Sequence, residues 1–593
     1  MTLKAEHKNP QVLKELIDIA KGERPAEICF KGGHFLDVFS GEFIKGDVAV
    51  HHGVVVGTME SYEAKEVVDI SGKYIVPGFI DSHTHIESSL MSPVRFEEAV
   101  MPCGTTTVIW DPHEIANVKG VEGIQWALDA TEDLSLDVFV MVPSCVPSTS
   151  PELSLETSGA HLTEKDLTPF QGHERVLGLA EMMNYPGLLS SDEDVINKLV
   201  SFSGMRRDGH CPGLEGKELN AYAVAGIHSC HESTTLKEAS EKLSKGIHVL
   251  IREGSCAKDA KTLLPMLGAK NALSIGMCSD DRNPSDIASE GHIDYILNMG
   301  LKDGLSAEDL FRAASYSAAK MYGLDDRGAI APGYLADFAV VEKKASGWDG
   351  GFLVDQVYKN GRLIKKDQLA SRKEALPPWK GKNINLAPVT KDDIAIKAQK
   401  SADPFQLTHV IGLIPNKLLT DHLKMEVRVE SGHLLADIEK DILKITVMER
   451  HHGKGYKTTG FVRGFQLQKG AIASSINHDC HNVIAVGASD KDIVTAINKL
   501  IDIDGGIVVV DQVGECHSLS LPIGGLMTSI APEEIAETLF VLKRVMKECG
   551  CPLSEPFLQL AFLALPVIPD LKISDLGLID VSKFKKIGLY AGL

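Results

Sequence analysis

The sequence predicts an α/β protein built on a (β/α)8 TIM-type barrel, with a small β-sandwich module and a C-terminal α+β domain. Short apolar runs alternate with turn residues before and after a central region that contains eight strand-like runs separated by helical segments. Eight such units over roughly 200 residues are typical of a closed parallel barrel, whose chemistry lies at the carboxyl ends of the strands. A chain of 593 residues is also too long for one ordinary core, so several domains are expected.

The β module is predicted from residues 1–77 together with a later return of the chain at 326–364. Gly-containing turn signals, the first at 31–33 and the last at 71–72, separate short apolar runs. This pattern is typical of a small antiparallel sheet. We expect the returning strands to complete the same module.

The barrel is predicted over residues 78–325. The fifth strand is the weakest, because Met205-Arg206-Arg207-Asp208 is too polar to identify as a strand alone. A helical stretch at 307–321 follows the last unit. The predicted strand runs lie at 78–81, 106–109, 138–141, 176–179, near His210, and at 225–228, 248–251 and 272–276.

The remainder of the chain is predicted to form a linker at 365–392 and a C-terminal α+β domain at 393–593. The linker is polar, contains Pro377-Pro378, and shows little periodicity. The C-terminal domain contains strand-like runs at 425–429 and 443–448 and a helix at 490–501.

Bulk composition excludes several classes of function. The net charge is -20 and no dense run of Lys and Arg is present, so a nucleic-acid partner is not expected. No stretch of about 18 apolar residues indicates a membrane span, and residues 1–10 lack a signal-peptide core. The 11 Cys are scattered without repeated CxxC pairs, which favours reduced thiols. We expect a cytoplasmic protein.

The strongest local signal is PGFIDSHTH at 77–85, which places His83 and His85 at the end of the first barrel strand. Residues two apart on a strand point the same way, so both rings can bind one metal ion. An isolated HxH is common by chance, and surface or hydrogen-bonded His is the alternative. Its position at the start of eight βα units favours the metal-ligand interpretation.

Several motifs carry a resemblance to a known family. PGFIDSHTH and the later GAIAPGYLADFAVV (328–341) are similar to the amidohydrolase superfamily. Six further motifs in one order resemble the bacterial adenine deaminase family: HIESSLMSP (85–93), DPHEIANV (111–118), GLAEMMNYPG (178–187), DGHCPGLEGKELNAY (208–222), CSDDRNP (278–284) and NHDCHNV (477–483). The resemblance implies a hydrolase that converts adenine to hypoxanthine and ammonia in purine salvage.

Further metal ligands are expected at other strand ends. Glu181 ends the fourth strand, where many relatives carry a carboxylated Lys, and the resemblance implies that it bridges two metals. The alternative is a Glu that stabilises a helix N-terminus. His210 ends the fifth strand, although a loop role is the alternative. The expected ligands are His83, His85, Glu181, His210, His231 and Asp280.

Two of these assignments leave a neighbouring residue as a competitor. His228 competes with His231 after the sixth strand, and the family resemblance favours His231. Asp281 competes with Asp280 after the eighth, where we expect Asp280 to face the metals and Asp281 to bond backbone or the substrate. The site is expected to hold two divalent metal ions, manganese or iron by resemblance, with zinc as a further option.

Bound metal lowers the pKa of its water to about 7, and we expect the resulting hydroxide to attack the purine carbon that bears the amino group. Asp280 is the expected general base and then general acid. Glu232 or His113 is the candidate that protonates the ring nitrogen.

Other residues are candidates for contacts with the substrate. Glu114 follows His113 in DPHE, where Asp111 as a helix N-cap with Glu114 in a capping box is the alternative. In the C-terminal domain, His478, Asp479 and His481 are expected to reach the site by closing over the barrel mouth or from a neighbouring subunit.

Two other functions compete with this prediction. A cyclic amide hydrolase of the dihydropyrimidinase type would use the same barrel, but the missing Lys and the DPHE and NHDCHNV motifs argue against it. A non-catalytic assembly protein on an amidohydrolase-like barrel should have lost ligands, whereas each expected position holds one. We expect a small purine substrate and a homo-oligomer.

Overall fold

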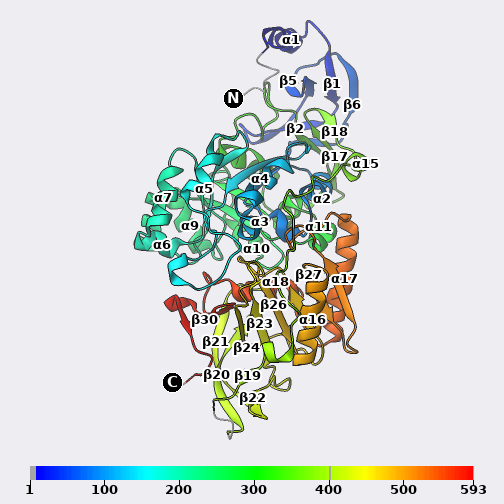
Figure 1. The fold of residues 1–593 in the computed structure, drawn as a ribbon. Coiled ribbons are helices and arrows are strands. Elements are labelled where there is room, and N and C mark those ends of the chain that lie inside the picture. The colour runs from blue at the N-terminus through cyan, green and yellow to red at the C-terminus, as the bar shows by residue number, and fades with distance from the viewer. Residues whose placement is uncertain (1–8, 400–402, 592–593) are drawn as a thin grey trace.

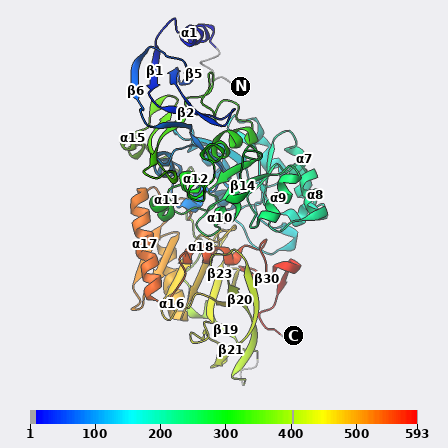
Figure 2. The same ribbon diagram turned by 180° about the vertical axis from the view of Figure 1, so that it is seen from behind.

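The computed structural model describes residues 9–399 and 403–591. Figure 1 shows an N-terminal β module at one end, the barrel in the middle and the C-terminal domain at the other end. The view from behind shows the same order, with the orange helices α16 and α17 along one side of the C-terminal domain (Figure 2). The barrel therefore lies between two flanking units.

The β module consists of two sheets, ordered β5-β4-β1-β6 and β18-β17-β16-β7-β2-β3. The returning strand β16 pairs with β7 (Phe338 opposite Pro77), so the chain after the barrel completes the module as predicted. The expectation of purely antiparallel pairing was wrong, because β1 pairs with β6, and β2 with β7, in parallel. The elements are α1 (Pro10–Ala20), β1 (Ala26–Lys31), β2 (His34–Asp37), β3 (Glu42–Lys45), β4 (Asp47–His51), β5 (Val54–Met59), β6 (Ala64–Asp69), β7 (Tyr74–Pro77), β16 (Phe338–Lys344), β17 (Gly347–Lys359) and β18 (Arg362–Leu363).

Eight parallel strands, β8 to β15, form the central sheet in sequence order. A parallel bridge between Thr84 and Asp280 joins the first strand to the segment after the last and closes the barrel. The (β/α)8 prediction is therefore confirmed. The strands are β8 (Phe79–Thr84), β9 (Thr105–Trp110), β10 (Asp137–Val142), β11 (Val176–Met182), β12 (Arg206–Gly209), β13 (Ser229–Cys230), β14 (His248–Arg252) and β15 (Ile275–Cys278).

The later barrel strands differ from the sequence prediction. The fifth strand, β12, includes the Arg206-Arg207 pair, because backbone pairing with β11 and β13 makes it a strand despite its polar side chains. The sixth is Ser229–Cys230, not 225–228, since Ala225 caps helix α8 and Gly226 (φ 85°) turns the chain there. The eighth begins at Ile275, after a turn that occupies the first predicted positions.

Helices connect the strands and pack outside them. A π-helical turn, Ala313–Ser317, interrupts the predicted helix at 307–321. The helices are α2 (Pro93–Val100), α3 (His113–Lys119), α4 (Val121–Asp129), α5 (Glu164–Leu167), α6 (Tyr185–Ser190), α7 (Glu193–Ser201), α8 (Gly216–Val224), α9 (Leu236–Ser244), α10 (Ala260–Leu263), α11 (Pro284–Glu290), α12 (Ile293–Lys302), α13 (Ala307–Arg312) and α14 (Ala318–Tyr322).

The C-terminal domain is α+β, as predicted. One sheet has the order β19-β22-β21-β20-β24-β23-β26-β25-β27-β28, and a second has the order β29-β30-β31. Its elements are β19 (Ile396–Lys397), β20 (Phe405–Leu413), β21 (Thr420–Glu430), β22 (His433–Leu434), β23 (Leu443–Met448), β24 (Lys457–Arg463), β25 (Ala471–Ser474), β26 (Val483–Gly487), α16 (Asp490–Asp502), β27 (Gly506–Val510), β28 (Cys516–Ser520), α17 (Pro532–Glu548), α18 (Pro556–Ala561), β29 (Leu571–Ser574), β30 (Gly577–Asp580) and β31 (Lys585–Ile587).

The barrel and the C-terminal domain share one hydrophobic core. Barrel residues such as Phe96 and Trp110 belong to the same buried cluster as Leu526 and Leu560. The proposed linker at 365–392 carries a short helix, α15 (Lys366–Ala370), and contacts both units. Arg372 hydrogen-bonds Ser135 of the barrel (2.8 Å), and the backbone N–H of Asn383 donates to Asp504 of the C-terminal domain (2.9 Å). The shared core holds the C-terminal domain over the barrel mouth.

All 11 cysteines, each of which lies in the described part of the chain, are free thiols. Among the described residues, no helix has the length and apolar character needed to cross a membrane.

Candidate metal centre

His83 lies in β8 and His85 directly follows it, with 4.7 Å between their ring centroids. Their Nε2 atoms are 3.1 Å apart, and both side chains are almost completely buried. His85 Nδ1 donates a hydrogen bond to the backbone carbonyl of Asp111 (2.9 Å), which leaves Nε2 as the lone-pair donor. Two converging imidazole nitrogens are the arrangement expected for ligands of one cation.

Glu181, at the end of β11, lies between two groups of histidines. Its Oε1 atom is 3.3 Å from Nε2 of His85 and 3.7 Å from Nε2 of His83. Its Oε2 atom is 2.6 Å from Nδ1 of His210 and 3.2 Å from Nε2 of His231. The carboxylate therefore presents one oxygen to each group, which is the geometry that a ligand shared by two cations needs.

Asp280 and Asp281 follow β15 and point in different directions. Oδ1 of Asp280 lies 3.2 Å from Nε2 of His85, and its Oδ2 accepts a hydrogen bond from Arg252 (3.0 Å). Asp280 has a φ of 53°, a left-handed conformation that Asp tolerates better than most residues. Oδ1 of Asp281 instead accepts a hydrogen bond from Ser88 Oγ (2.5 Å). The turn thus directs only Asp280 to the histidines.

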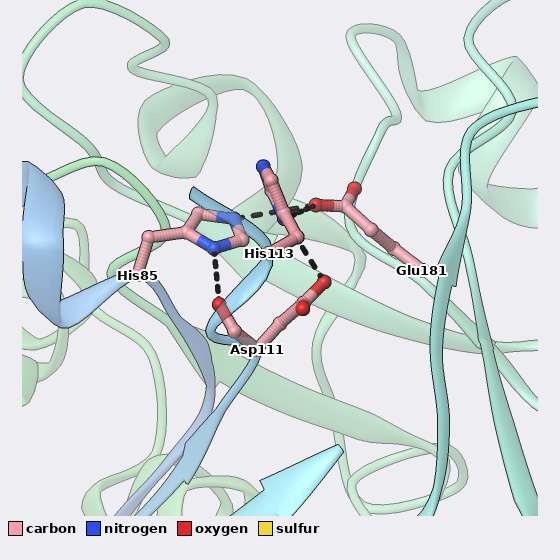
Figure 3. A group of neighbouring side chains, drawn as sticks. All are labelled: His85, Asp111, His113 and Glu181. Atoms are coloured by element: carbon pink, nitrogen blue, oxygen red, sulfur yellow. Dashed lines mark hydrogen bonds and ion pairs between the residues drawn. The ribbon is translucent and has the colours of Figure 1, made fainter. Parts of the chain in front are cut away.

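His113 is the first residue of α3 and joins the same group (Figure 3). Its Nδ1 atom lies 3.1 Å from Oδ2 of Asp111 and 3.5 Å from Oε1 of Glu181. The capping-box alternative was wrong: Pro112 occupies the N-cap position, and the Asp111 side chain contacts His113 instead of the helix backbone. Asp111 is a site residue that the sequence analysis missed, although it directly follows the end of β9.

Glu232 lines the cavity beside the metal-ligand candidates but is paired with an arginine side chain. Its carboxylate forms a salt bridge with Arg252, which also contacts Asp259 (2.8 Å). Burial would raise the pKa of Glu232, but the Arg252 guanidinium and nearby histidines lower it to about 2. Glu232 is therefore an ionised hydrogen-bond acceptor in this arrangement.

The C-terminal domain of the same chain reaches the barrel mouth. His478 and Asp479 line the cavity, and Asp479 Oδ1 lies 3.7 Å from Nε2 of His113. His481 and Glu114 do not line it. They lie behind it, with 3.6 Å between His481 Nε2 and Glu114 Oε2.

An apolar roof from the C-terminal domain also lines the cavity, and sequence reasoning missed it. The ring of Phe562 stacks on His478 with 4.5 Å between centroids. Leu418, Leu565 and Ile568 lie around it. No local pattern distinguishes these residues from ordinary core positions, so only the fold reveals them.

The donor set fits divalent metal ions. Four imidazoles and two carboxylates lie together, each with at most 6% of its surface exposed. Overlapping groups that could hold a cation include His83-His85-Asp280, His83-Glu181-His231 and His85-Asp111-His113-Glu181. Nitrogen and carboxylate donors suit manganese, iron or zinc. His228, the competitor of His231, instead accepts a hydrogen bond from the backbone N–H of Arg207 (3.2 Å).

Comparisons with known proteins cover nearly the whole chain. Residues 74–364 match the amidohydrolase family, and residues 417–585 match the adenine deaminase C-terminal domain. The adenine deaminase of Brucella anthropi is 46% identical over 577 residues, which is 97% of this chain and 100% of that protein. Adenine deaminase 1 of Rhizobium meliloti is 44% identical over 583 residues, covering 98% and 100% of the two chains.

Proposed function

Because this chain belongs to the adenine deaminase family of amidohydrolases, we propose that it hydrolyses adenine to hypoxanthine and ammonia. The single observation that carries the proposal is the placement of the Glu181 carboxylate between two groups of histidines beneath a roof from the C-terminal domain. The roof comes from the region that matches the family's C-terminal domain.

We assign the donors to two metal ions, manganese or iron. His83, His85 and Asp280 would hold one, His210 and His231 would hold the other, and Glu181 would contribute an oxygen to each. When bound, the metals supply hydroxide near neutral pH by lowering the pKa of water.

The chain's own residues handle the protons. Asp280 accepts a proton from the nucleophile and delivers it to the departing amino nitrogen. One C–O bond forms and one C–N bond breaks, so water is consumed and ammonia is released. We assign ring-nitrogen protonation to His113. Burial would lower the pKa of His113, but the carboxylates of Asp111 and Asp479 raise it above its usual value.

The remaining cavity residues are assigned to binding the base. Phe562 and His478 offer ring faces, and Asp281, Asp479 and Glu232 offer carboxylates that can accept hydrogen bonds from N–H groups of a purine. Glu114 and His481 do not line the cavity, so we assign them to supporting the residues that do. Glu114 Oε1 lies 2.7 Å from the hydroxyl oxygen of Ser88, which also contacts Asp281.

The test is ammonia release by the manganese-loaded protein from adenine, guanine, cytosine, adenosine and dihydrouracil. We expect adenine to be the preferred substrate and adenosine to be poor, because the roof leaves little room for ribose. Ammonia release only from guanine or cytosine, or efficiency on adenosine equal to that on adenine, would contradict the proposal. Turnover of dihydrouracil would indicate a cyclic amide hydrolase.

A further inference from the structure

A second, larger cavity lies beside the metal centre. This interdomain cleft, of about 850 Å³, is lined by barrel residues such as Thr234 and by C-terminal residues such as Asn416. It shares three lining residues with the metal cavity, namely Glu232, Leu418 and Ile568. The shared residues lie at the boundary between the two cavities.

A buried lysine contacts Leu418, one of the C-terminal residues that line both cavities. Lys572, on β29, has no exposed surface. Its Nζ atom donates hydrogen bonds to the backbone carbonyls of Leu418 (2.7 Å) and Phe562 (3.0 Å). These two acceptors lie on separate segments, and both residues line the metal cavity. One lysine side chain therefore ties together two parts of the roof.

The surroundings of Lys572 give it no ordinary ion pair. Within the described residues, no carboxylate lies within salt-bridge distance of its Nζ atom. Burying an ammonium group is costly unless its hydrogen bonds are made. Consistent with this cost, burial lowers the pKa of Lys572 to about 7. The chain has a lysine here although a methionine of similar length would fill the same space without a buried amine.

Backbone contacts reinforce the connection. The backbone N–H of Asp570 donates to the carbonyl of Thr420 (3.0 Å), and that of Thr420 donates to the carbonyl of Pro569 (3.1 Å). The Thr420 hydroxyl also donates to the carbonyl of Leu571 (2.9 Å). The start of β21 is thus attached to the strand that carries Lys572, and Lys572 extends this attachment to Leu418 and across to Phe562.

We propose that Lys572 is a positioning residue that holds Leu418 and Phe562 in place and so sets the opening between the interdomain cleft and the metal cavity. This inference rests on the proposed function, because it makes the cleft the route by which adenine reaches the metals. Lys572 acts through the roof and does not touch the reacting atoms.

The test compares Lys572→Met with Lys444→Met. Lys444 is a matched control, since it is also a buried lysine of the C-terminal domain, but it pairs with Asp490 (2.8 Å). Loss of charge-assisted hydrogen bonds should raise amide hydrogen exchange in residues 414–420 and 556–565 by roughly tenfold or more in Lys572→Met only. KM for adenine should rise roughly tenfold, with a smaller change in kcat and unchanged metal content.

Several outcomes would overturn the inference. If both variants show the same exchange in these segments and the same KM as the unaltered protein, Lys572 has only a structural role. If Lys572→Met does not fold, Lys572→Gln, which keeps one donor group, should show the same changes at smaller size, and its failure to do so counts equally against the inference. If the unaltered protein does not act on adenine, the proposed function fails, whereas the exchange data still decide whether Lys572 holds the roof.

Discussion

Nε2 of His113 lies 3.7 Å from Oδ1 of Asp479. This contact joins the first turn of a barrel helix to a loop of the C-terminal domain. His113 also contacts Asp111 and Glu181. The C-terminal domain therefore supplies a charged group to the site instead of only covering it.

Asp479→Asn is expected to lower turnover of adenine by about 10²-fold, because the amide no longer stabilises the protonated form of His113. Metal content should be unchanged, which plasma emission analysis checks beside steady-state kinetics. Asp511→Asn is the matched control, since Asp511 pairs with His517 (3.1 Å) on the surface of the same domain. Equal activity in the two variants would remove Asp479 from the site.

The protein purified without chelator is expected to contain two metal equivalents per chain, because Glu181 offers one oxygen to each group of histidines. Chelation should abolish activity, and manganese or iron should restore it. Glu181→Gln should lose at least one equivalent, since an amide is a poorer bridging ligand than a carboxylate. A reproducible single equivalent in fully active protein would rule out the bridging role.

Asp280→Asn should retain much of the metal and lose about 10²–10⁴-fold in kcat, because an amide cannot accept the proton of the nucleophile. Asp281→Asn should have a smaller effect that appears mainly in KM, since Asp281 points to Ser88. Both variants are measured with adenine under the same metal loading. The reverse order of effects would show that the general base was assigned to the wrong carboxylate.

Glu253 should make stability depend on pH. Burial raises its pKa from 4.5 to about 7, partly offset by a hydrogen bond from the Ala260 N–H. The native state then binds more protons than the unfolded state between these values, so the free energy of unfolding falls as pH rises from about 4.5 to 7. The loss approaches about 3 kcal/mol at full titration.

Glu253→Gln should lack this loss, because the amide does not titrate. Urea unfolding at pH 5, 6, 7 and 8 measures the difference. The variant should gain stability relative to the unaltered protein as pH rises. Parallel curves at all four values would show that Glu253 does not titrate in this range.

Local patterns determined the fold class and the residue types at the strand ends. His83 and His85 could be predicted as a pair because side chains two apart on a strand share one face. Glu181 and Asp280 could be predicted because each follows an apolar run and the parallel strands of a barrel end at one rim. His210 follows a polar segment, so its prediction depended on the family resemblance. The structure brings all of these residues together.

Only the tertiary structure decided which distant residues contact these predicted metal ligands. Ser229–Cys230 and the polar β12 are strands because neighbouring strands pair with them. The periodicity of their own segments does not predict this pairing. The Asp111 side chain contacts His113 instead of capping a helix, and Arg252 neutralises Glu232. The roof residues Phe562 and Leu418, to which Lys572 donates hydrogen bonds, lie over the site because the C-terminal domain packs on the barrel through a shared core. Sequence periodicity records which face of an element is buried, whereas contacts between separate elements arise only when the whole chain packs.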